Sequence, residues 1–168
     1  FKLDANQNIC IHKDKKFAVF YIDFENFKYI NDIFGYDYGD MILKRYANLM
    51  MNDIGKYEIF AREIADRFVA LRCYVDKEDL VVRQRDVDNE LINITNEIKN
   101  KHSITVVSGI CCIEDVNEKL SIDGLINRAN FAQKTVKNKP GTNYAFYNDS
   151  IRKKMIEENT IDRKSTRL

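Results

Sequence analysis

The sequence predicts a single α/β (α+β) domain in which helices pack on one central sheet of about five strands of mixed direction. Three observations support this fold class. Short apolar runs, of the kind that form buried strands, alternate with longer amphipathic segments of helical spacing. Two strand candidates follow one another closely enough to form a hairpin, which makes the sheet mixed. The length of 168 residues fits one domain with a core of its own.

The first half of the chain supplies one strand, one helix and the hairpin. Residues 17–22 form a continuous apolar run rich in aromatic and β-branched side chains, which is typical of a central strand buried on both faces. Over residues 37–54 apolar side chains recur at helical spacing, with Asp37 as a candidate N-cap. Residues 57–62 and 68–75 have the composition of strands, and the tight connection between them predicts a hairpin.

The second half of the chain continues the alternation. Residues 77–100 carry one apolar stripe on a polar segment and predict a long amphipathic helix. Residues 104–113 are almost wholly apolar and predict a strand. Ser121 is a suitable N-cap for the helix that follows it. Residues 144–147 predict a short final strand, and residues 150–159 a helix that could lead into a following domain.

Composition and charge exclude several classes of function. Lys and Arg number 27 against 26 Asp and Glu, and a net charge of +1 is too small to favour nucleic acid or a membrane surface as a partner. The sequence contains no run of about 18 apolar residues and no signal-peptide pattern, so we expect a cytoplasmic domain that makes no membrane contact. The parent protein could still be membrane-anchored. Because the chain starts at Phe1 and ends in a polar stretch, we expect residues 1–168, with a core of about 17–147, to be one domain cut from a longer multidomain protein.

Two acidic residues stand where chemistry is expected. Asp23 closes the first predicted strand, and Asp66 lies just past the hairpin turn. If these strands are neighbours, both carboxylates lie at one edge of the sheet. Paired carboxylates suit a Mg²⁺ site for phosphoryl chemistry, because this hard cation prefers oxygen ligands and bridges substrate phosphates. Spacing alone leaves open the alternative that Asp23 only ends a strand and Asp66 only belongs to a turn.

Longer motifs place these residues in a family context. Residues 23–40, DFENFKYINDIFGYDYGD, resemble the DxDxFKxxNDxxGHxxGD segment of GGDEF (diguanylate cyclase) domains. Residues 61–68, AREIADRF, occupy the place of the family's ARxGGDEF. Residues 104–110 resemble its vTvSxGv strand, and residues 128–141 its closing RADxA…K…G helix. The resemblance covers residues 17–147 and implies a nucleotidyl-cyclase-like sheet with flanking helices.

The resemblance also implies ligands and site residues. Members of this family condense two GTP into cyclic di-GMP, and each of two domains presents one GTP to the other. The resemblance therefore implies GTP and Mg²⁺ as ligands and a homodimer as the working assembly. By role, the matching positions are Asp23, Asp66 and the backbone carbonyl of Phe24 for Mg²⁺, Asp66 and Lys28 for catalysis, and Asn31, Tyr36, Asp40 and Lys137 for nucleotide binding.

The family signature is degenerate in this chain. Residues 64–68 read Ile-Ala-Asp-Arg-Phe in place of Gly-Gly-Asp-Glu-Phe. Glycines in such a turn permit positive φ and close approach of a ligand. The β-branched Ile64 is a poor fit for positive φ and adds bulk where nucleotide would lie, so the turn must differ in shape or tilt away. Arg67 reverses the charge of the signature glutamate and weakens Mg²⁺ binding, or it bridges Asp23 and Asp66 in place of the metal.

A second family motif is also changed. The product-inhibition motif RxxD falls at residues 55–58, where Gly55 stands in place of the arginine. Product feedback of the usual kind is therefore not expected.

Three functions remain open from the sequence. The first is a catalytically inactive, regulatory domain of cyclic di-GMP signalling that binds GTP and controls an adjacent EAL-type phosphodiesterase domain or answers to a sensor domain. The second is a weakly active diguanylate cyclase. The third is an interaction or dimerisation module without nucleotide. Because both turn glycines and the signature glutamate are replaced, we expect no efficient turnover and leave the enzyme assignment open, leaning towards a non-catalytic domain. The second function is favoured by the retained Asp23, Lys28, Asn31, Asp40 and Asp66.

Overall fold

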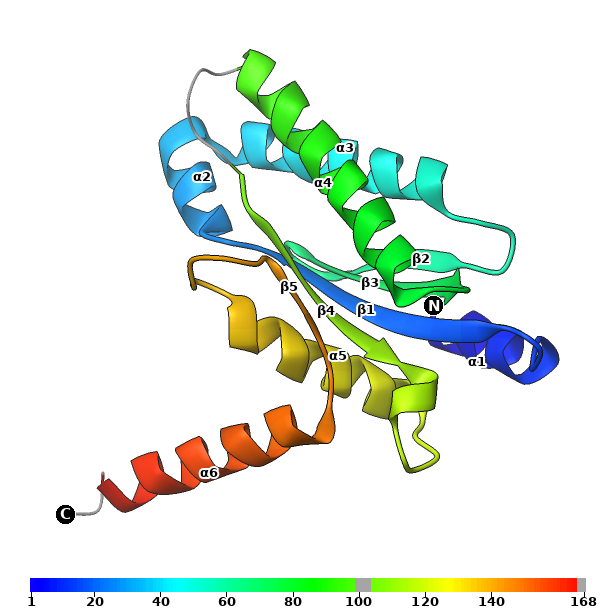
Figure 1. The fold of residues 1–168 in the computed structure, drawn as a ribbon. Helices are drawn as coiled ribbons and strands as arrows, with labels where there is room; N and C mark the ends of the chain where they lie inside the picture. The colour runs from blue at the N-terminus through cyan, green and yellow to red at the C-terminus, as the bar shows by residue number, and fades with distance from the viewer. Residues whose placement is uncertain (99–103, 166–168) are drawn as a thin grey trace.

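A five-stranded sheet forms the middle layer of the molecule, as the computed structural model in Figure 1 shows for residues 1–98 and 104–165. The strand order is β2-β3-β1-β4-β5. Neighbouring strands are antiparallel except for β4 and β5, which are parallel, so the sheet is mixed as the sequence predicts. The strands are β1 (Lys16–Phe24), β2 (Ile59–Ile64), β3 (Arg67–Tyr74), β4 (Val106–Cys112) and β5 (Tyr144–Phe146).

The central strand β1 is buried along almost its whole length because both faces of the sheet are covered. Phe20 and Ile22 belong to the core on one face, whereas Val19 and Tyr21 belong to the core on the other. A strand between two layers has no polar face, which explains the continuous apolar run in its sequence.

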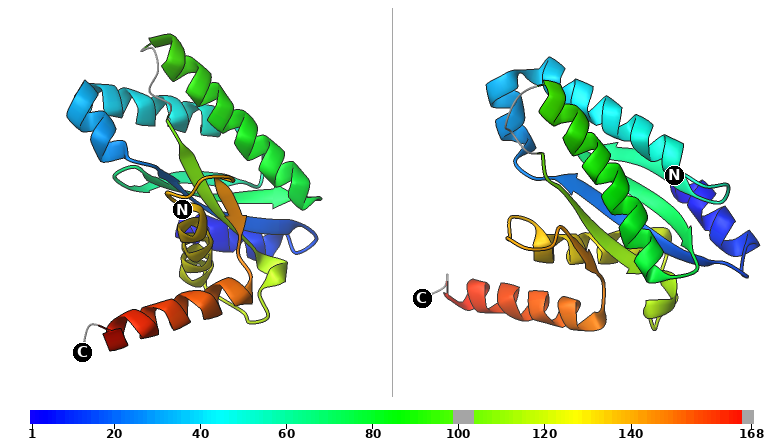
Figure 2. Two further views of the ribbon diagram at one scale, coloured as in Figure 1. Left: turned by 60° about the vertical axis from the view of Figure 1, so that its left-hand side comes forward. Right: turned by 45° about the horizontal axis from the view of Figure 1, so that its top comes forward.

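Helices cover the two faces of the sheet in separate groups (Figure 2). One face is covered by α2 (Phe27–Phe34), α3 (Tyr36–Asp53) and α4 (Lys77–Ile98), and the other by α1 (Lys2–Ile11) and α5 (Ile122–Val136). The last helix, α6 (Asp149–Ser165), extends away from the sheet (Figure 1). Among the described helices, none is both long and apolar enough to cross a membrane.

The predicted strands agree with the observed ones to within two residues at each end. The cap at Ser121 is confirmed, since its Oγ accepts a hydrogen bond from the backbone N–H of Gly124. The end of the predicted helix at residues 99–100 lies outside the described residues.

Three local features differ from the prediction. Helices α1 and α2 were not predicted; α1 has little amphipathic signal, with Ala5 its one buried residue. The cap expected at Asp37 is wrong, because α3 begins one residue earlier. Gly35 occupies the N-cap position with φ of +86°, which glycine adopts readily, and it leaves Asp37 inside the first turn.

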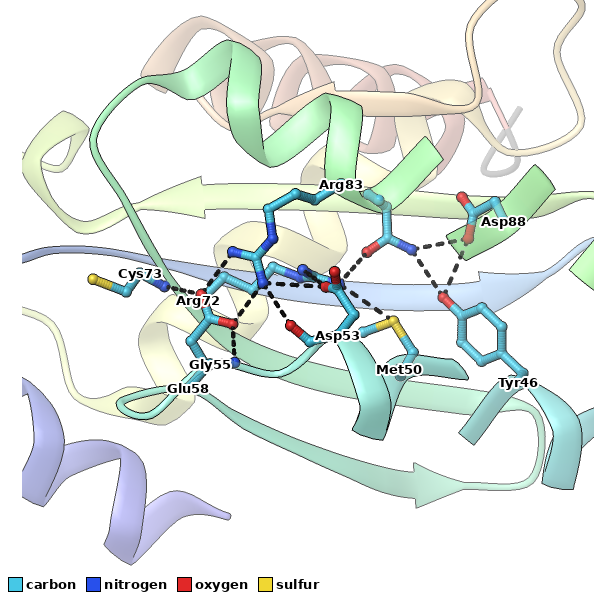
Figure 3. Close-up of polar contacts among 10 residues, drawn as sticks. Tyr46, Met50, Asp53, Gly55, Glu58, Arg72, Cys73, Arg83 and Asp88 are labelled. Carbon is cyan, nitrogen blue, oxygen red and sulfur yellow. Dashed lines mark hydrogen bonds and ion pairs between the residues drawn. The ribbon is translucent and has the colours of Figure 1, made fainter. Parts of the chain in front are cut away.

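A buried polar network fixes α3 against β3 and α4 (Figure 3). Arg72, in β3, is fully buried and forms an ion pair with Asp53 at the end of α3. The side chain of Gln84, in α4, accepts from Arg72 and donates to Tyr46 and Asp88. Buried polar groups of this kind stabilise a fold only when they are paired. The network therefore sets the position of α3, whose other end carries candidate site residues.

Asp88 is a buried titratable group of this network. Its side chain accepts hydrogen bonds from Gln84 and Tyr46, and burial raises its pKa to about 7. In the unfolded chain an aspartate has a pKa of about 4. The folded protein therefore binds a proton between pH 4 and pH 7 that the unfolded chain does not, and stability falls as the pH rises through this window.

We expect Asp88→Asn, which resembles the protonated side chain, to raise the free energy of unfolding by about 1–3 kcal/mol at pH 8. The gain should shrink as the pH is lowered towards 5. Urea unfolding at several pH values measures it. The exposed neighbour Asp86 provides the matched control, because Asp86→Asn should show no such pH dependence. A constant gain for Asp88→Asn across the pH range would contradict the prediction.

Candidate functional site

Asp23 lies at the end of the central strand, on the face of the sheet that α5 covers. It is buried, with 4% of its surface exposed. Its Oδ1 accepts a hydrogen bond of 2.9 Å from the backbone N–H of Phe24, and its Oδ2 forms an ion pair with Nζ of Lys137. Both oxygens of this buried carboxylate therefore have a partner, as a buried charge requires.

Asp66 lies in the turn of the β2–β3 hairpin, at the same edge of the sheet. Strand β3 is the neighbour of β1, and Phe68 pairs with Ile22, so the turn lies beside the end of β1. Partial burial raises the pKa of Asp66, and the negative charge of Asp23 raises it further. The structure thus places the two carboxylates at one edge of the sheet, as the sequence predicts, and near enough for the charge of one to act on the other.

The cation that the structure places on Asp23 is Lys137, not Arg67. Among the residues that the structure describes, no ion pair joins Arg67 to Asp23 or Asp66, so the bridge considered from the sequence is not formed. Arg67 is exposed, and the group that raises its pKa most is Tyr21, with smaller contributions from the two carboxylates. Arg67 therefore adds positive electrostatic potential near the two carboxylates without forming an ion pair with either of them.

The backbone of the signature turn is strained at its second residue. Ala65 has φ of +52°, in the left-handed region that glycine adopts without cost. Ile64 lies at the end of β2 opposite Arg67, after an irregularity in the pairing, and 62% of its side chain is exposed. The expected conflict between a β-branched side chain and positive φ does not arise at Ile64. The residue that takes the glycine conformation is Ala65.

The candidate nucleotide-binding residues lie on α2 and α3. Asn31, on α2, packs against Gly39 at the start of α3, where an added Cβ would lie 1.9 Å from its Oδ1. This Oδ1 is buried and has no hydrogen-bond partner among the described residues. A buried acceptor without a donor is costly and suits a ligand that supplies one.

The remaining candidates are exposed and stand apart. Lys28, Tyr36 and Asp40 are exposed to solvent. In the described part of the chain, no hydrogen bond or ion pair connects them to Asp23 or Asp66. The structure thus brings together the candidate metal ligands and Lys137, but it does not join them to the α2–α3 residues through protein contacts.

Glu25 is a site residue that the sequence reasoning missed. Its Oε1 accepts a hydrogen bond of 2.6 Å from the backbone N–H of Asn138, the residue after Lys137. The signal was present, because Glu25 stands two positions after Asp23, and alternate residues of an extended strand point to the same side.

The segment in the place of the product-inhibition motif is closed by internal contacts (Figure 3). Glu58 is buried and accepts hydrogen bonds from the backbone N–H groups of Gly55 and Cys73 and from the guanidinium of Arg83. Burial alone would raise the pKa of Glu58, but these donors outweigh it and lower the pKa. Arg83 also pairs with Asp53. The carboxylate is therefore directed into the protein.

The donor set at the sheet edge fits Mg²⁺ when phosphates complete the coordination. Asp23 and Asp66 offer carboxylate oxygens at one edge, and a cation between them would relieve the repulsion that raises the pKa of Asp66. Within residues 1–98 and 104–165, no cluster of three or more His, Cys, Asp or Glu side chains converges on one point. Mg²⁺ is commonly held by one or two carboxylates together with substrate phosphates, so two carboxylates are sufficient.

Comparison with known proteins gives a consistent result. The model of the family described as "Diguanylate cyclase, GGDEF domain" matches residues 2–143. The Bacillus subtilis (strain 168) protein YtrP is 28% identical over 142 residues, which cover 84% of this chain and 23% of that protein. A bifunctional diguanylate cyclase/cyclic di-GMP phosphodiesterase, MucR of Pseudomonas aeruginosa, is 34% identical over 61 residues, which cover 36% of this chain and 9% of MucR. The chain spans less than a quarter of the length of these curated relatives.

Solved structures support the fold. The GGDEF domain of DgcB from Caulobacter crescentus, in complex with c-di-GMP, matches with a TM-score of 0.69 at 16% identity, covering 86% of this chain and 84% of that one. The active GGEEF domain of a diguanylate cyclase from Vibrio cholerae matches with a TM-score of 0.68 at 21% identity, covering 87% and 93%. At these identities the likeness establishes the fold.

We expect Ala65→Gly to raise the melting temperature by about 1–4 °C, because relief of the left-handed strain exceeds the entropy that glycine loses on folding. Thermal unfolding followed by circular dichroism measures the change. The control is Ala47→Gly in α3, where the backbone is helical and glycine should cost about 1 kcal/mol. A decrease for Ala65→Gly as large as that for Ala47→Gly would show that the turn is not strained.

Proposed function

The chain belongs to the GGDEF (diguanylate cyclase) family, and on that premise we propose that it is a regulatory domain of cyclic di-GMP signalling that binds GTP with Mg²⁺ but turns it over poorly. One observation carries the proposal: the signature turn keeps Asp66 beside Asp23 but has lost both glycines and the glutamate. The signature residue that would hold a cation, Asp66, is present, whereas the two glycines and the glutamate of the family signature are replaced.

Retained side chains support nucleotide binding. The buried and unpartnered Oδ1 of Asn31 suits a donor on the edge of guanine, which carries N–H groups. Lys137 brings a positive charge to the carboxylate edge, where the phosphates of a nucleotide would meet the metal. Bound Mg²⁺ would neutralise phosphate charge at Asp23 and Asp66.

Replaced side chains support poor turnover. The exposed side chain of Ile64 and the Cβ of Ala65 occupy space that the family's glycines leave open. The charge of Arg67 acts on both carboxylates and opposes a cation there. Catalysis requires reacting groups held to within about an ångström, whereas binding tolerates more. The changes therefore affect turnover more than binding.

The internal contacts of residues 55–58 support regulation by a route other than binding of the product at this segment. Glu58 is engaged by Arg83 and two backbone donors, and Gly55 has no side chain to offer a ligand. We propose that the output is an EAL-type phosphodiesterase domain in the same polypeptide. The combination of cyclase and phosphodiesterase in the name of the relative MucR favours this arrangement.

A weakly active cyclase is the second candidate. It is favoured by the two carboxylates at the sheet edge. They repel each other, as the raised pKa of Asp66 indicates, and a perturbed pair of this kind is typical of a functional site. This function would require two domains to face each other, so it predicts a homodimer, whereas nucleotide binding alone does not.

GTP with Mg²⁺ should raise the melting temperature by about 5–10 °C at 100 times its dissociation constant, and ATP should raise it much less. Asn31→Ala should abolish most of the GTP effect, because the guanine edge loses its acceptor. The control Asn89→Ala, at an exposed position of α4, should leave it intact. Equal shifts with GTP and ATP would contradict guanine recognition. No shift at millimolar GTP would favour an interaction module without nucleotide.

Incubation with GTP and Mg²⁺, followed by separation of the nucleotides, tests turnover directly. We expect the native chain to form little cyclic di-GMP, and the triple variant Ile64→Gly, Ala65→Gly, Arg67→Glu to form at least about tenfold more, equal to about 1.4 kcal/mol in the activation barrier. Clear cyclic di-GMP formation by the native chain would replace the regulatory proposal with the weak cyclase. A triple variant that still binds GTP but remains inactive would show that the signature is not the main defect.

A further inference from the structure

The segment that follows α5 is fastened to the end of β1 at two consecutive residues. Helix α5 ends at Val136, and Lys137 leaves it with an extended ψ of 132°. The Nζ of Lys137 pairs with Oδ2 of Asp23, and the backbone N–H of Asn138 donates to Oε1 of Glu25. We call residues 137–138 the strap.

Glu25 is itself held in place, so it can position the strap. Its backbone N–H donates to the carbonyl of Thr105 over 2.9 Å, which extends the pairing of β1 with the neighbouring segment. Asn138 has φ of +58°, a left-handed conformation that asparagine tolerates better than most residues. The chain therefore turns sharply directly after Lys137, and the hydrogen bond to Glu25 holds that turn.

The strap covers the oxygen of Asp23 that the backbone of β1 leaves without a partner. Oδ1 accepts a hydrogen bond from the backbone N–H of Phe24, whereas Oδ2 is in contact with Lys137. An ammonium and Mg²⁺ cannot share this oxygen, because both require direct contact and they repel each other. The side chain of Lys137 is 31% exposed, whereas that of Asp23 is 6% exposed, so the lysine is the partner with room to move.

We propose that Lys137 and Glu25 form a latch: Lys137 excludes Mg²⁺ from Asp23, and Glu25 is the positioning residue that holds the strap carrying it. The latch rests on the proposed nucleotide site, because the phosphates of a nucleotide offer Lys137 a new anionic partner and free Asp23 for the metal. Mg²⁺ and a nucleoside triphosphate then bind with positive coupling, since each favours the open strap.

A calorimetric titration with Mg²⁺ in the absence of nucleotide tests the latch independently of GTP binding. Lys137→Met should raise the affinity for Mg²⁺ at least about tenfold over the native chain. The control Lys139→Met removes the same charge from the same loop, but Lys139 forms no ion pair with Asp23 in the described residues, so its effect should stay below about twofold. If the native chain binds Mg²⁺ too weakly to measure and Lys137→Met binds it measurably while Lys139→Met does not, the latch is equally supported.

A second pair of variants isolates Glu25. Glu25→Gln and Glu25→Ala lose the same negative charge, but glutamine keeps an oxygen that can accept from Asn138. We expect Glu25→Ala to bind Mg²⁺ about threefold more tightly than Glu25→Gln, because only alanine releases the strap. Circular dichroism of each variant verifies that it is folded.

Three results would overturn the latch: equal gains for Lys137→Met and Lys139→Met, no gain for Lys137→Met, or equal affinities of the two Glu25 variants. These results are separate from a failure of the proposed function, which would appear as an absent GTP-dependent shift in melting temperature. A gain for Lys137→Met without any GTP binding would leave the latch standing as an ion-excluding contact and remove its nucleotide trigger.

Discussion

The repulsion between two carboxylates at one edge of the sheet is the constraint on which the site depends. Asp23 and Asp66 come together because β1 and β3 are neighbours and the hairpin turn lies beside the end of β1. Two negative charges in a partly buried place need a cation, or one of them must hold a proton. The protein supplies Lys137 to Asp23 and leaves Asp66 with a raised pKa. The edge is therefore only partly neutralised by the protein itself, which favours a cationic ligand.

The degenerate turn changes the surroundings of this edge more than the edge itself. Asp66 takes its place because the two-residue loop Ala65-Asp66 joins β2 to β3, and Ala65 accepts the left-handed conformation at a modest cost in energy. The nearby Arg62 helps to hold the turn, since its Nε donates to the carbonyl of Ala65. A strained alanine at this point shows that the backbone path of the turn is set by the strands around it and not by the residue that occupies it.

Much of the fold could be predicted from the sequence because the three inner strands, β1, β3 and β4, are buried along most of their length. A strand such as β1 must be apolar throughout, and that pattern is hard to produce in another way. Helix α1 was not predicted because it has few buried side chains. Helix α2 was not predicted because it is only eight residues long and follows Asn26, whose left-handed conformation the residue type does not fix. The prediction of Asp37 as the N-cap was wrong because Gly35 takes that position. The start of the helix depends on the backbone angle φ at Gly35, which residue type alone does not fix.

The carboxylate pair of the site could also be predicted, because Asp23 lies near the end of one strand and Asp66 in the turn before its neighbour, but their cation could not. Arg67 is adjacent to Asp66 in sequence, whereas Lys137 reaches Asp23 from 114 positions away along the chain. A contact of that kind depends on where α5 ends relative to β1, and α5 packs on both β1 and β4. The same helix also contacts α1 and α6. If the strap opens when ligand binds, the C-terminal end of α5 loses its link to β1, and both terminal helices, α1 and α6, are in contact with α5. A regulatory domain needs such a ligand-dependent difference between two states, and it does not need turnover. The proposed regulatory role is consistent with a signature turn without glycines beside Lys137 and Asp23, which both match the family motifs.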